Sequence, residues 1–255
     1  MAFITIECLS EVLGRQTSID VIIPQKRTAG EIGIANNAKS EKYKTLVLLH
    51  GLSDNSRIWA RRTNIDRYAT EKGIAVIMPS AERSFYTNMH NGDNFADFIG
   101  KEVLSIAREY LPLSEKCEDT FIAGNSMGGY GAMKMALKFP ETFSAAAGLS
   151  SVADVAKFME ERYPQLGAQI FGEGNKVPDS EDLFALTTAC ENNPLRPRLY
   201  MIEGLGDFML EENRRLQAHI KKLDYDFTYE EYEGVHDWAF WDTYIQKVLA
   251  WMFDG

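Results

Sequence analysis

The sequence predicts an α/β fold in which a mostly parallel central sheet carries helices on both faces. Short continuous apolar runs alternate along the chain with longer segments of helical periodicity. Such runs indicate strands that are covered on both faces, as in a parallel sheet. One run leads through a Gly-x-Ser-x-Gly turn directly into a helical segment. An aspartate and then a histidine follow two later runs, so chemically active side chains gather at strand ends.

Length and composition are those of one globular domain. The chain has 255 residues, of which 45% are hydrophobic and 25% are charged, which is enough for a single large core. The net charge is −10, which argues against nucleic acid or an anionic membrane as a partner, because both select clustered Lys and Arg. We therefore expect a neutral or small substrate.

The N-terminus and the cysteines indicate a cytoplasmic protein. Residues 1–7 alternate as a strand does and lack the basic region and long apolar run of a signal peptide. No stretch approaches transmembrane length. Cys8, Cys117 and Cys190 are isolated, without the Cys-x-x-Cys spacing of a zinc site or a disulfide framework. We expect reduced thiols, no metal and no cofactor.

Apolar periodicity and breaker residues predict the elements in order. The first two strands are expected to form an antiparallel edge pair around a turn at Gly14, and the polar residues 25–43 and 80–94 to form loops. The predicted strands cover residues 2–9, 18–24, 45–49, 74–78, 120–123, 143–149, 198–203 and 226–232. The predicted helices cover residues 63–72, 95–111, 130–139, 211–223 and 239–253.

Residues 150–197 interrupt this alternation. Helical pieces near 152–162 and 181–190 flank a segment that is rich in glycine. We predict a small lid or cap inserted at about 150–197 into a single domain that spans residues 1–255, rather than a second domain. The apolar side chains of the insert either shape substrate selectivity or anchor the insert, and the sequence leaves both roles open.

The Gly-x-Ser-x-Gly turn spans residues 124–128 and is the nucleophile-elbow pattern of α/β-hydrolases. At the apex of a tight strand-to-helix turn, strained backbone holds the hydroxyl of Ser126 clear of the sheet. Gly124 and Gly128 lack the Cβ atoms that would collide as strand and helix close on each other. Met127 begins the helix with a free N–H, a donor for an oxyanion. We predict Ser126 as a nucleophile; the alternative is an ordinary N-capping serine.

Two residues complete a candidate catalytic triad. Asp207 and His236 follow predicted strands, and the order serine, aspartate, histidine is that of α/β-hydrolases. A histidine suits a general base because the reference pKa of an imidazole is about 6.5. Sequence neighbours offer alternatives for the acid, while the other histidines lie in a loop or within a helix. These alternatives are Asp224, Asp226 and Asp237 for the acid, and His90 and His219 for the base.

The turn after the 45–49 strand predicts the second half of an oxyanion hole. In His50-Gly51-Leu52, the N–H of Leu52 would join that of Met127. We expect His50 to shape this turn rather than to act as the base. Loops that follow parallel strands line the ligand crevice. The candidate substrate pocket consists of His50, Trp59, Tyr86 and Trp238.

Three segments together resemble one family. His50-Gly51-Leu52-Ser53, the stretch from Gly124 to Ala132, and His236-Asp237-Trp238-Ala239-Phe240-Trp241 are similar to the esterase D-like esterases of the α/β-hydrolase superfamily, in particular the bacterial tributyrin esterases. Trp59-x-x-Arg62-Thr63-Asn64 and Phe85-Tyr86-Thr87 also resemble that group, so the similarity spans nearly the whole chain.

The resemblance implies a cytoplasmic serine carboxylesterase that acts on small-molecule esters with acetyl, propionyl or butyryl groups. By motif position, Ser126, Asp207 and His236 correspond to the family's triad, and Leu52 and Met127 to its oxyanion amides. Members are often homo-oligomers. The alternatives that stay open are feruloyl or acetylxylan esterases, S-formylglutathione hydrolases and acyltransferases. S-formylglutathione hydrolases typically carry a cysteine in the segment after the glycine that corresponds to Gly51, and this chain lacks it. A non-catalytic binding protein of the same fold is the alternative from another class.

Overall fold

The computed structural model describes residues 1–25, 35, 37 and 41–254. Most of the predicted loop over 25–43 lies outside these residues. At its end, Tyr43 forms an isolated parallel bridge with Leu113. Within the described part of the chain, no helix is long and apolar enough to cross a membrane.

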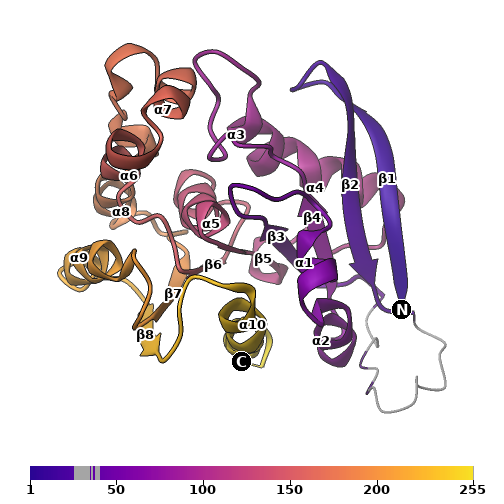
Figure 1. The fold of residues 1–255 in the computed structure, drawn as a ribbon. Coiled ribbons are helices and arrows are strands. Elements are labelled where there is room, and N and C mark those ends of the chain that lie inside the picture. The colour runs from indigo at the N-terminus through magenta and orange to yellow at the C-terminus, as the bar shows by residue number, and fades with distance from the viewer. Residues whose placement is uncertain (26–34, 36, 38–40, 255) are drawn as a thin grey trace.

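The described residues form an eight-stranded sheet in the order β1-β2-β4-β3-β5-β6-β7-β8 (Figure 1). The first strand pairs antiparallel with the second, the second pairs antiparallel with β4, and all later neighbours are parallel. This confirms the predicted mostly parallel sheet with an antiparallel edge pair. The strands are β1 (Ala2–Ser10), β2 (Arg15–Ile23), β3 (Thr45–Leu49), β4 (Ala75–Pro79), β5 (Thr120–Asn125), β6 (Ala145–Leu149), β7 (Arg198–Gly204) and β8 (Phe227–Tyr232).

Helices cover both faces of the sheet (Figure 1). Side chains of α1, α2 and α10 belong to the apolar cluster on one face, and those of α4, α5, α8 and α9 to the cluster on the other. The helices are α1 (Ile58–Arg62), α2 (Ile65–Lys72), α3 (Phe95–Asp97), α4 (Val103–Tyr110), α5 (Met127–Lys138), α6 (Val155–Arg162), α7 (Pro164–Phe171), α8 (Leu183–Cys190), α9 (Leu210–Ile220) and α10 (Trp238–Phe253).

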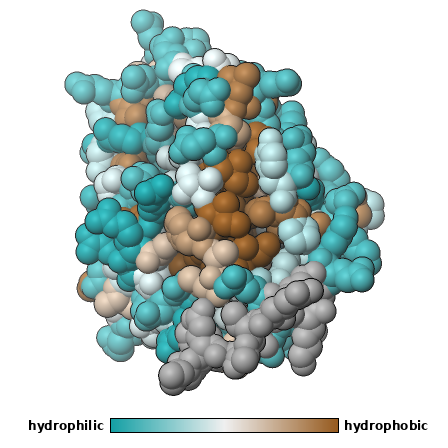
Figure 2. Space-filling model, turned by 90° about the vertical axis from the view of Figure 1, so that its right-hand side faces the viewer, coloured by the Kyte–Doolittle hydropathy of each residue, from teal (hydrophilic) through white to brown (hydrophobic). Residues whose placement is uncertain are grey.

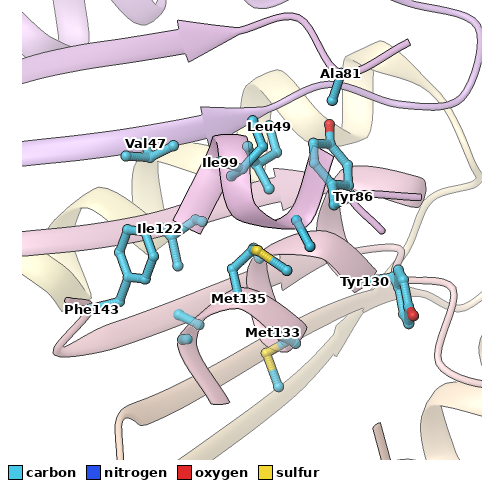
Figure 3. Packing of buried hydrophobic residues seen from close by; sticks show 14 of the residues in the cluster. Val47, Leu49, Ala81, Tyr86, Ile99, Ile122, Tyr130, Met133, Met135 and Phe143 are labelled. Atoms are coloured by element: carbon cyan, nitrogen blue, oxygen red, sulfur yellow. The ribbon is translucent and has the colours of Figure 1, made fainter. Parts of the chain in front are cut away.

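The period of two along a strand explains the two clusters. Leu46 and Leu48 of β3 face the α2 and α10 side, whereas Val47 and Leu49 face the α5 side. Figure 3 shows the second set, with Met133 of α5 among the side chains packed against the strands. Both faces of each central strand are therefore buried, which is why these strands read as continuous apolar runs.

One of the two edge strands of the sheet is β1, at the right of Figure 1. Figure 2 looks onto this side of the molecule, where apolar side chains form a band within a largely hydrophilic face. Phe3 and Leu9 of β1 are 44% and 60% exposed. Phe3 and Leu9 lie on the same face of β1, with Thr5 and Glu7 between them, whereas Ile4, Ile6 and Cys8 of the other face pack in the core.

Two predicted helices have different internal structure. The helix predicted over 63–72 begins at Ile65, and the separate helix α1 precedes it. Thr63 divides the two helices. Its N–H donates to the Trp59 carbonyl at the end of α1, and its hydroxyl accepts the Ile65 N–H at 3.2 Å. Gly73 closes α2 in the left-handed conformation, as predicted. The helix over 95–111 contains a π-helical turn at Phe98–Glu102, which brings Gly100 against the ring of Phe139.

The insert over 150–197 contains one helix more than predicted. The glycine-rich segment was expected to separate two helical pieces, but α7 lies within it. Pro164 occupies the first turn, where its missing N–H costs nothing, and Gly172 ends the helix at a φ of 89°. Gly167 inside α7 has no Cβ, which allows close packing on Met159 of α6. The insert stands beside α5 (Figure 1).

Candidate active site

The elbow between β5 and α5 has the strained backbone that the sequence predicts. Ser126 has a φ of 55° and a ψ of −118°, and its N–H bonds to the carbonyl of Leu149 in β6 at 2.9 Å. A Cβ on Gly124 would lie 2.5 Å from the backbone of Gly128. Positive φ is costly for a residue with a side chain, so the packing around the turn must hold Ser126 in place.

Two hydrogen bonds join Ser126, His236 and Asp207. The Nε2 of His236 lies 3.0 Å from the Oγ of Ser126, and its Nδ1 lies 2.8 Å from Oδ2 of Asp207. The other oxygen of Asp207 accepts the Met209 N–H at 2.9 Å. The three groups come from the ends of β5, β7 and β8, three strands whose carboxyl ends meet at one edge of the sheet.

The surroundings favour an ionised aspartate beside the histidine. Burial is the largest single influence on Asp207 and opposes its charge, but the hydrogen bond and electrostatic attraction of His236, together with hydrogen bonds from Met209 and Ser150, outweigh it, so the pKa of this carboxyl lies below its usual value. The imidazole is held between the ring of Phe208 and the edge of Trp241, with centroids 4.8 and 5.0 Å away. These contacts fix the plane in which the histidine meets Ser126.

A second carboxyl lies behind the aspartate. Glu203 is 1% exposed, and neither of its oxygens has a hydrogen-bond partner among the described residues. Burial, and next the charge of Asp207, raise the pKa of Glu203 to about 10. Glu203 is therefore neutral at physiological pH. Glu203 was not predicted from the sequence, because a glutamate at the end of a buried strand carries no motif.

A cavity of about 640 Å³ opens above Ser126. Leu52 and Met127 line it, and their N–H groups donate no hydrogen bond to another described residue. These are the two amides that the sequence predicts for an oxyanion hole. The remaining walls come from loops, the insert and α10: Gly51, Ser53, Asp54, Arg83, Phe85, Asn125, Val152, Phe158, Tyr163, Phe208, Met209, Asp237, Trp238 and Trp241.

Of the four predicted pocket residues, only Trp238 lines this cavity. His50, Trp59 and Tyr86 are 1%, 0% and 0% exposed and lie beneath it, which corrects the expectation that they contact substrate. Figure 3 shows Tyr86 packed near Leu49 and Ala81. Large aromatic side chains such as those of His50, Trp59 and Tyr86 suit a core as well as a pocket, so the sequence alone did not distinguish a core position from a pocket position.

The three buried residues instead support the loop that carries Leu52. The Nε2 of His50 accepts the Ala81 N–H at 3.0 Å, its Nδ1 lies 2.7 Å from the Gly51 carbonyl, and Tyr86 donates to the His50 carbonyl at 2.7 Å. Burial lowers the pKa of His50 to about 4, so its imidazole is neutral. As the sequence predicts, His50 shapes the turn. Trp59 donates to the Leu49 carbonyl at 2.9 Å.

The alternative acids and bases lie elsewhere or have other partners. Asp237 accepts the Phe240 N–H at 2.9 Å and so caps α10, and Asp224 pairs with Arg196. His219 contacts Thr188 and the Phe184 carbonyl. Among the described residues, no three His, Cys, Asp or Glu side chains are grouped as metal ligands.

The sheet order, the elbow after β5 and the side chains at the strand ends define a protein of the α/β-hydrolase fold. The model of the family described as "Putative esterase" matches residues 10–252. The chain belongs to this family and is a carboxylic ester hydrolase.

Similar proteins cover the whole chain. An acetyl esterase of Caldicellulosiruptor saccharolyticus is 35% identical over 263 residues, which span 99% of this chain and 98% of that one. The substrate-bound structure of fluorophosphonate-binding serine hydrolase F of Staphylococcus aureus is 32% identical, with a TM-score of 0.90 over 100% and 99% of the two chains. An S-formylglutathione hydrolase of the same organism is 32% identical, with a TM-score of 0.86 over 99% and 98%.

Proposed function

We propose that this chain hydrolyses small, short-chain acyl esters through an acyl-enzyme on Ser126. The observation that carries the proposal is the pair of hydrogen bonds, 3.0 and 2.8 Å long, that links Ser126, His236 and Asp207 on the floor of the cavity. Family membership favours this esterase over a non-catalytic binding protein.

In acylation, the Oγ of Ser126 attacks the ester carbonyl while its proton passes to Nε2 of His236. Asp207 holds the other ring nitrogen and stabilises the imidazolium. The N–H groups of Leu52 and Met127 stabilise the oxyanion, and each such donor is worth about 3 to 4 kcal/mol of barrier lowering. The carbon–oxygen bond to the alcohol then breaks, and His236 returns the proton to the departing oxygen.

Deacylation repeats these steps with water. His236 takes a proton from the water, whose oxygen attacks the acyl carbonyl, and the bond to Ser126 breaks as the serine recovers its proton. The products are the free acid and regenerated enzyme. Because nucleophile, base and oxyanion donors all belong to the protein, the proposed reaction uses no cofactor.

A relative named acetyl esterase supports a preference for short acyl groups. A relative named S-formylglutathione hydrolase makes a formyl thioester the second candidate substrate. Three free cysteines support the proposed cytoplasmic location, where thiols stay reduced. Tributyrin hydrolysis, and activity on feruloyl or acetylxylan esters, are further outcomes that a substrate panel decides.

The test is steady-state hydrolysis of p-nitrophenyl esters from acetate to octanoate, beside tributyrin, S-formylglutathione, a feruloyl ester and acetylated xylan. We expect the highest kcat/KM at two to four carbons. The Ser126→Ala variant should lose about three orders of magnitude or more in kcat while keeping its fold, and Ser105→Ala, on the exposed side of α4, serves as the control. Unchanged turnover in Ser126→Ala would exclude the proposed nucleophile.

A further inference from the structure

A second hollow opens beside the active-site cavity, and we call it the side chamber. Its volume is also about 640 Å³. Arg83 and Tyr163 line both hollows, so the two adjoin at these side chains. The remaining walls of the side chamber are Arg162, Pro164, Gln165, Leu166 and Gln169.

The lining of the side chamber is cationic in a chain whose net charge is −10. It contains two arginines and two glutamines and no acidic residue. Asp54 and Asp237 line only the main cavity. Guanidinium and amide groups are hydrogen-bond donors that suit a carboxylate, which arginine binds with two parallel hydrogen bonds.

Neither arginine forms an ion pair with another described residue. The acidic residues near Arg83 are already bound: Arg15 contacts Glu82 at 2.6 Å and Asp93 at 2.9 Å. Both Arg83 and Arg162 are exposed. Two guanidinium groups beside a cavity therefore keep their donors available for a ligand.

Aromatic side chains hold these guanidinium groups at the cavity. Arg83 lies over the ring of Tyr163, 5.6 Å from its centroid, and Arg162 lies over the ring of Phe208 at 4.3 Å. Tyr163 and Phe208 are themselves cavity walls. Stacking on a ring restricts an arginine side chain, which lowers the conformational entropy that binding must remove.

The position of Phe208 indicates which part of an ester reaches the arginines. The ring of Phe208 packs 4.8 Å from that of His236. His236 protonates the departing alcohol in the proposed mechanism, so the alcohol part lies on the histidine side of Ser126. An alcohol that extends past Phe208 approaches Arg162, which lines the side chamber and also a small hollow that Phe208 shares with Asp154, Glu161 and Glu212.

We propose that the side chamber binds a carboxylate on the alcohol part of the ester substrate. The preferred substrate is then an acyl ester of a hydroxy acid, which yields the acyl acid and the free hydroxy acid. This rests on the proposed esterase function. It also departs from the expectation of a neutral or small substrate, because the substrate becomes small and anionic.

The test compares matched esters that differ only in charge. 4-Acetoxybenzoate and 3-(4-acetoxyphenyl)propanoate carry the carboxylate at two distances, and the corresponding amides are neutral. We expect the wild-type kcat/KM to favour at least one acid over its amide. Arg83→Gln and Arg162→Gln should each lower kcat/KM for that acid by about five- to tenfold, leave its amide within twofold, and together erase the preference.

The control is Arg61→Gln, which removes the same charge from an exposed position of α1 outside both hollows. It should leave the ratio of acid to amide unchanged. Wild-type enzyme without a preference for either acid, or variants that lose both substrates equally, would overturn the proposal.

A binding measurement separates this proposal from the proposed function. Calorimetry with the Ser126→Ala variant measures the affinity of each acid and amide without turnover. Tighter binding of the acid, lost in the Arg83→Gln/Arg162→Gln background, supports the side chamber even if the wild-type chain hydrolyses none of the four esters. Equal affinity for acid and amide rejects it even if the enzyme is an active esterase.

Discussion

Gly128 in the first turn of α5 packs directly on Leu49 at the end of β3. A Cβ on Gly128 would lie 2.5 Å from the Leu49 carbonyl oxygen, and the obstacle is backbone that cannot swing away. This contact brings the N-terminus of α5, with the Met127 amide, close to the loop that carries Leu52. The distance between the two proposed oxyanion donors depends on it.

We therefore expect Gly128→Ala to displace α5 from β3 and to lower both stability, by about 3 kcal/mol or more, and kcat. Urea unfolding and p-nitrophenyl acetate hydrolysis measure the two effects. Gly14→Ala is the control, because Gly14 has a φ of 65° but no atom within 4 Å of an added Cβ. It should cost only about 1 kcal/mol and leave kcat unchanged. Full activity in Gly128→Ala would contradict this account.

Asp207→Asn should lower kcat by about three to four orders of magnitude with little change in KM. An asparagine can still accept the Met209 N–H, so the fold is kept, but it cannot stabilise the imidazolium or enforce the same tautomer. Steady-state kinetics measures the change. Asp224→Asn, at an exposed ion pair with Arg196, should behave as wild type. Comparable losses in both variants would argue against Asp207 as the acid.

Glu203 predicts a stability that falls as pH rises. The pKa of its carboxyl is about 10 in the folded chain, against an ordinary value of 4.5, so between these limits the folded state holds a proton that the unfolded state releases. The free energy of unfolding therefore decreases as the pH rises from about 4.5 to about 10. Glu203→Gln cannot release a proton, so its advantage over wild type should grow by about 4 kcal/mol between pH 5 and pH 8.

Urea unfolding of Glu203→Gln and wild type at both pH values makes this comparison. The activity of Glu203→Gln should stay near that of wild type at pH 7, because the amide is neutral like the protonated acid. A stability difference that is the same at pH 5 and pH 8 would show that Glu203 is ionised in the folded protein.

The insert is joined to α5 by a buried ion network. Nζ of Lys134, which is 0% exposed, lies 2.5 Å from Glu181 of the insert, and Lys138 contacts the other oxygen of Glu181. Glu181→Gln leaves Lys134 buried without a countercharge, at a cost of about 3 to 5 kcal/mol. Lys134→Met should cost less, because Lys138 still balances Glu181. Thermal unfolding of the two variants measures this order, and the reverse order would refute it.

Several features follow from sequence alone because their causes are local. The apolar runs predicted central strands such as β3 and β4, because a strand buried on both faces needs apolar residues at successive positions. The edge strand β1 was predicted from the alternation of its residues instead. The elbow at Ser126 was visible because glycine is required where helix and strand backbones touch. Asp207 and His236 were candidates because the carboxyl ends of neighbouring parallel strands meet at one edge of the sheet.

Other features depend on contacts between distant segments. His50, Trp59 and Tyr86 have side chains that suit a pocket, yet they pack beneath the cavity, because segments remote in sequence close over them. The helix α7 continues through Gly167 because Met159 and Asn175 pack closely against this glycine, where a Cβ would not fit.

Arg83, Arg162 and Phe208 carry no motif, and only tertiary structure places them together beside His236. Local sequence thus determined the backbone and the order of the reactive groups. The shape and charge of the space around them were decided by packing between the insert, the loops and α10, because a cavity is what remains when side chains from many segments have packed.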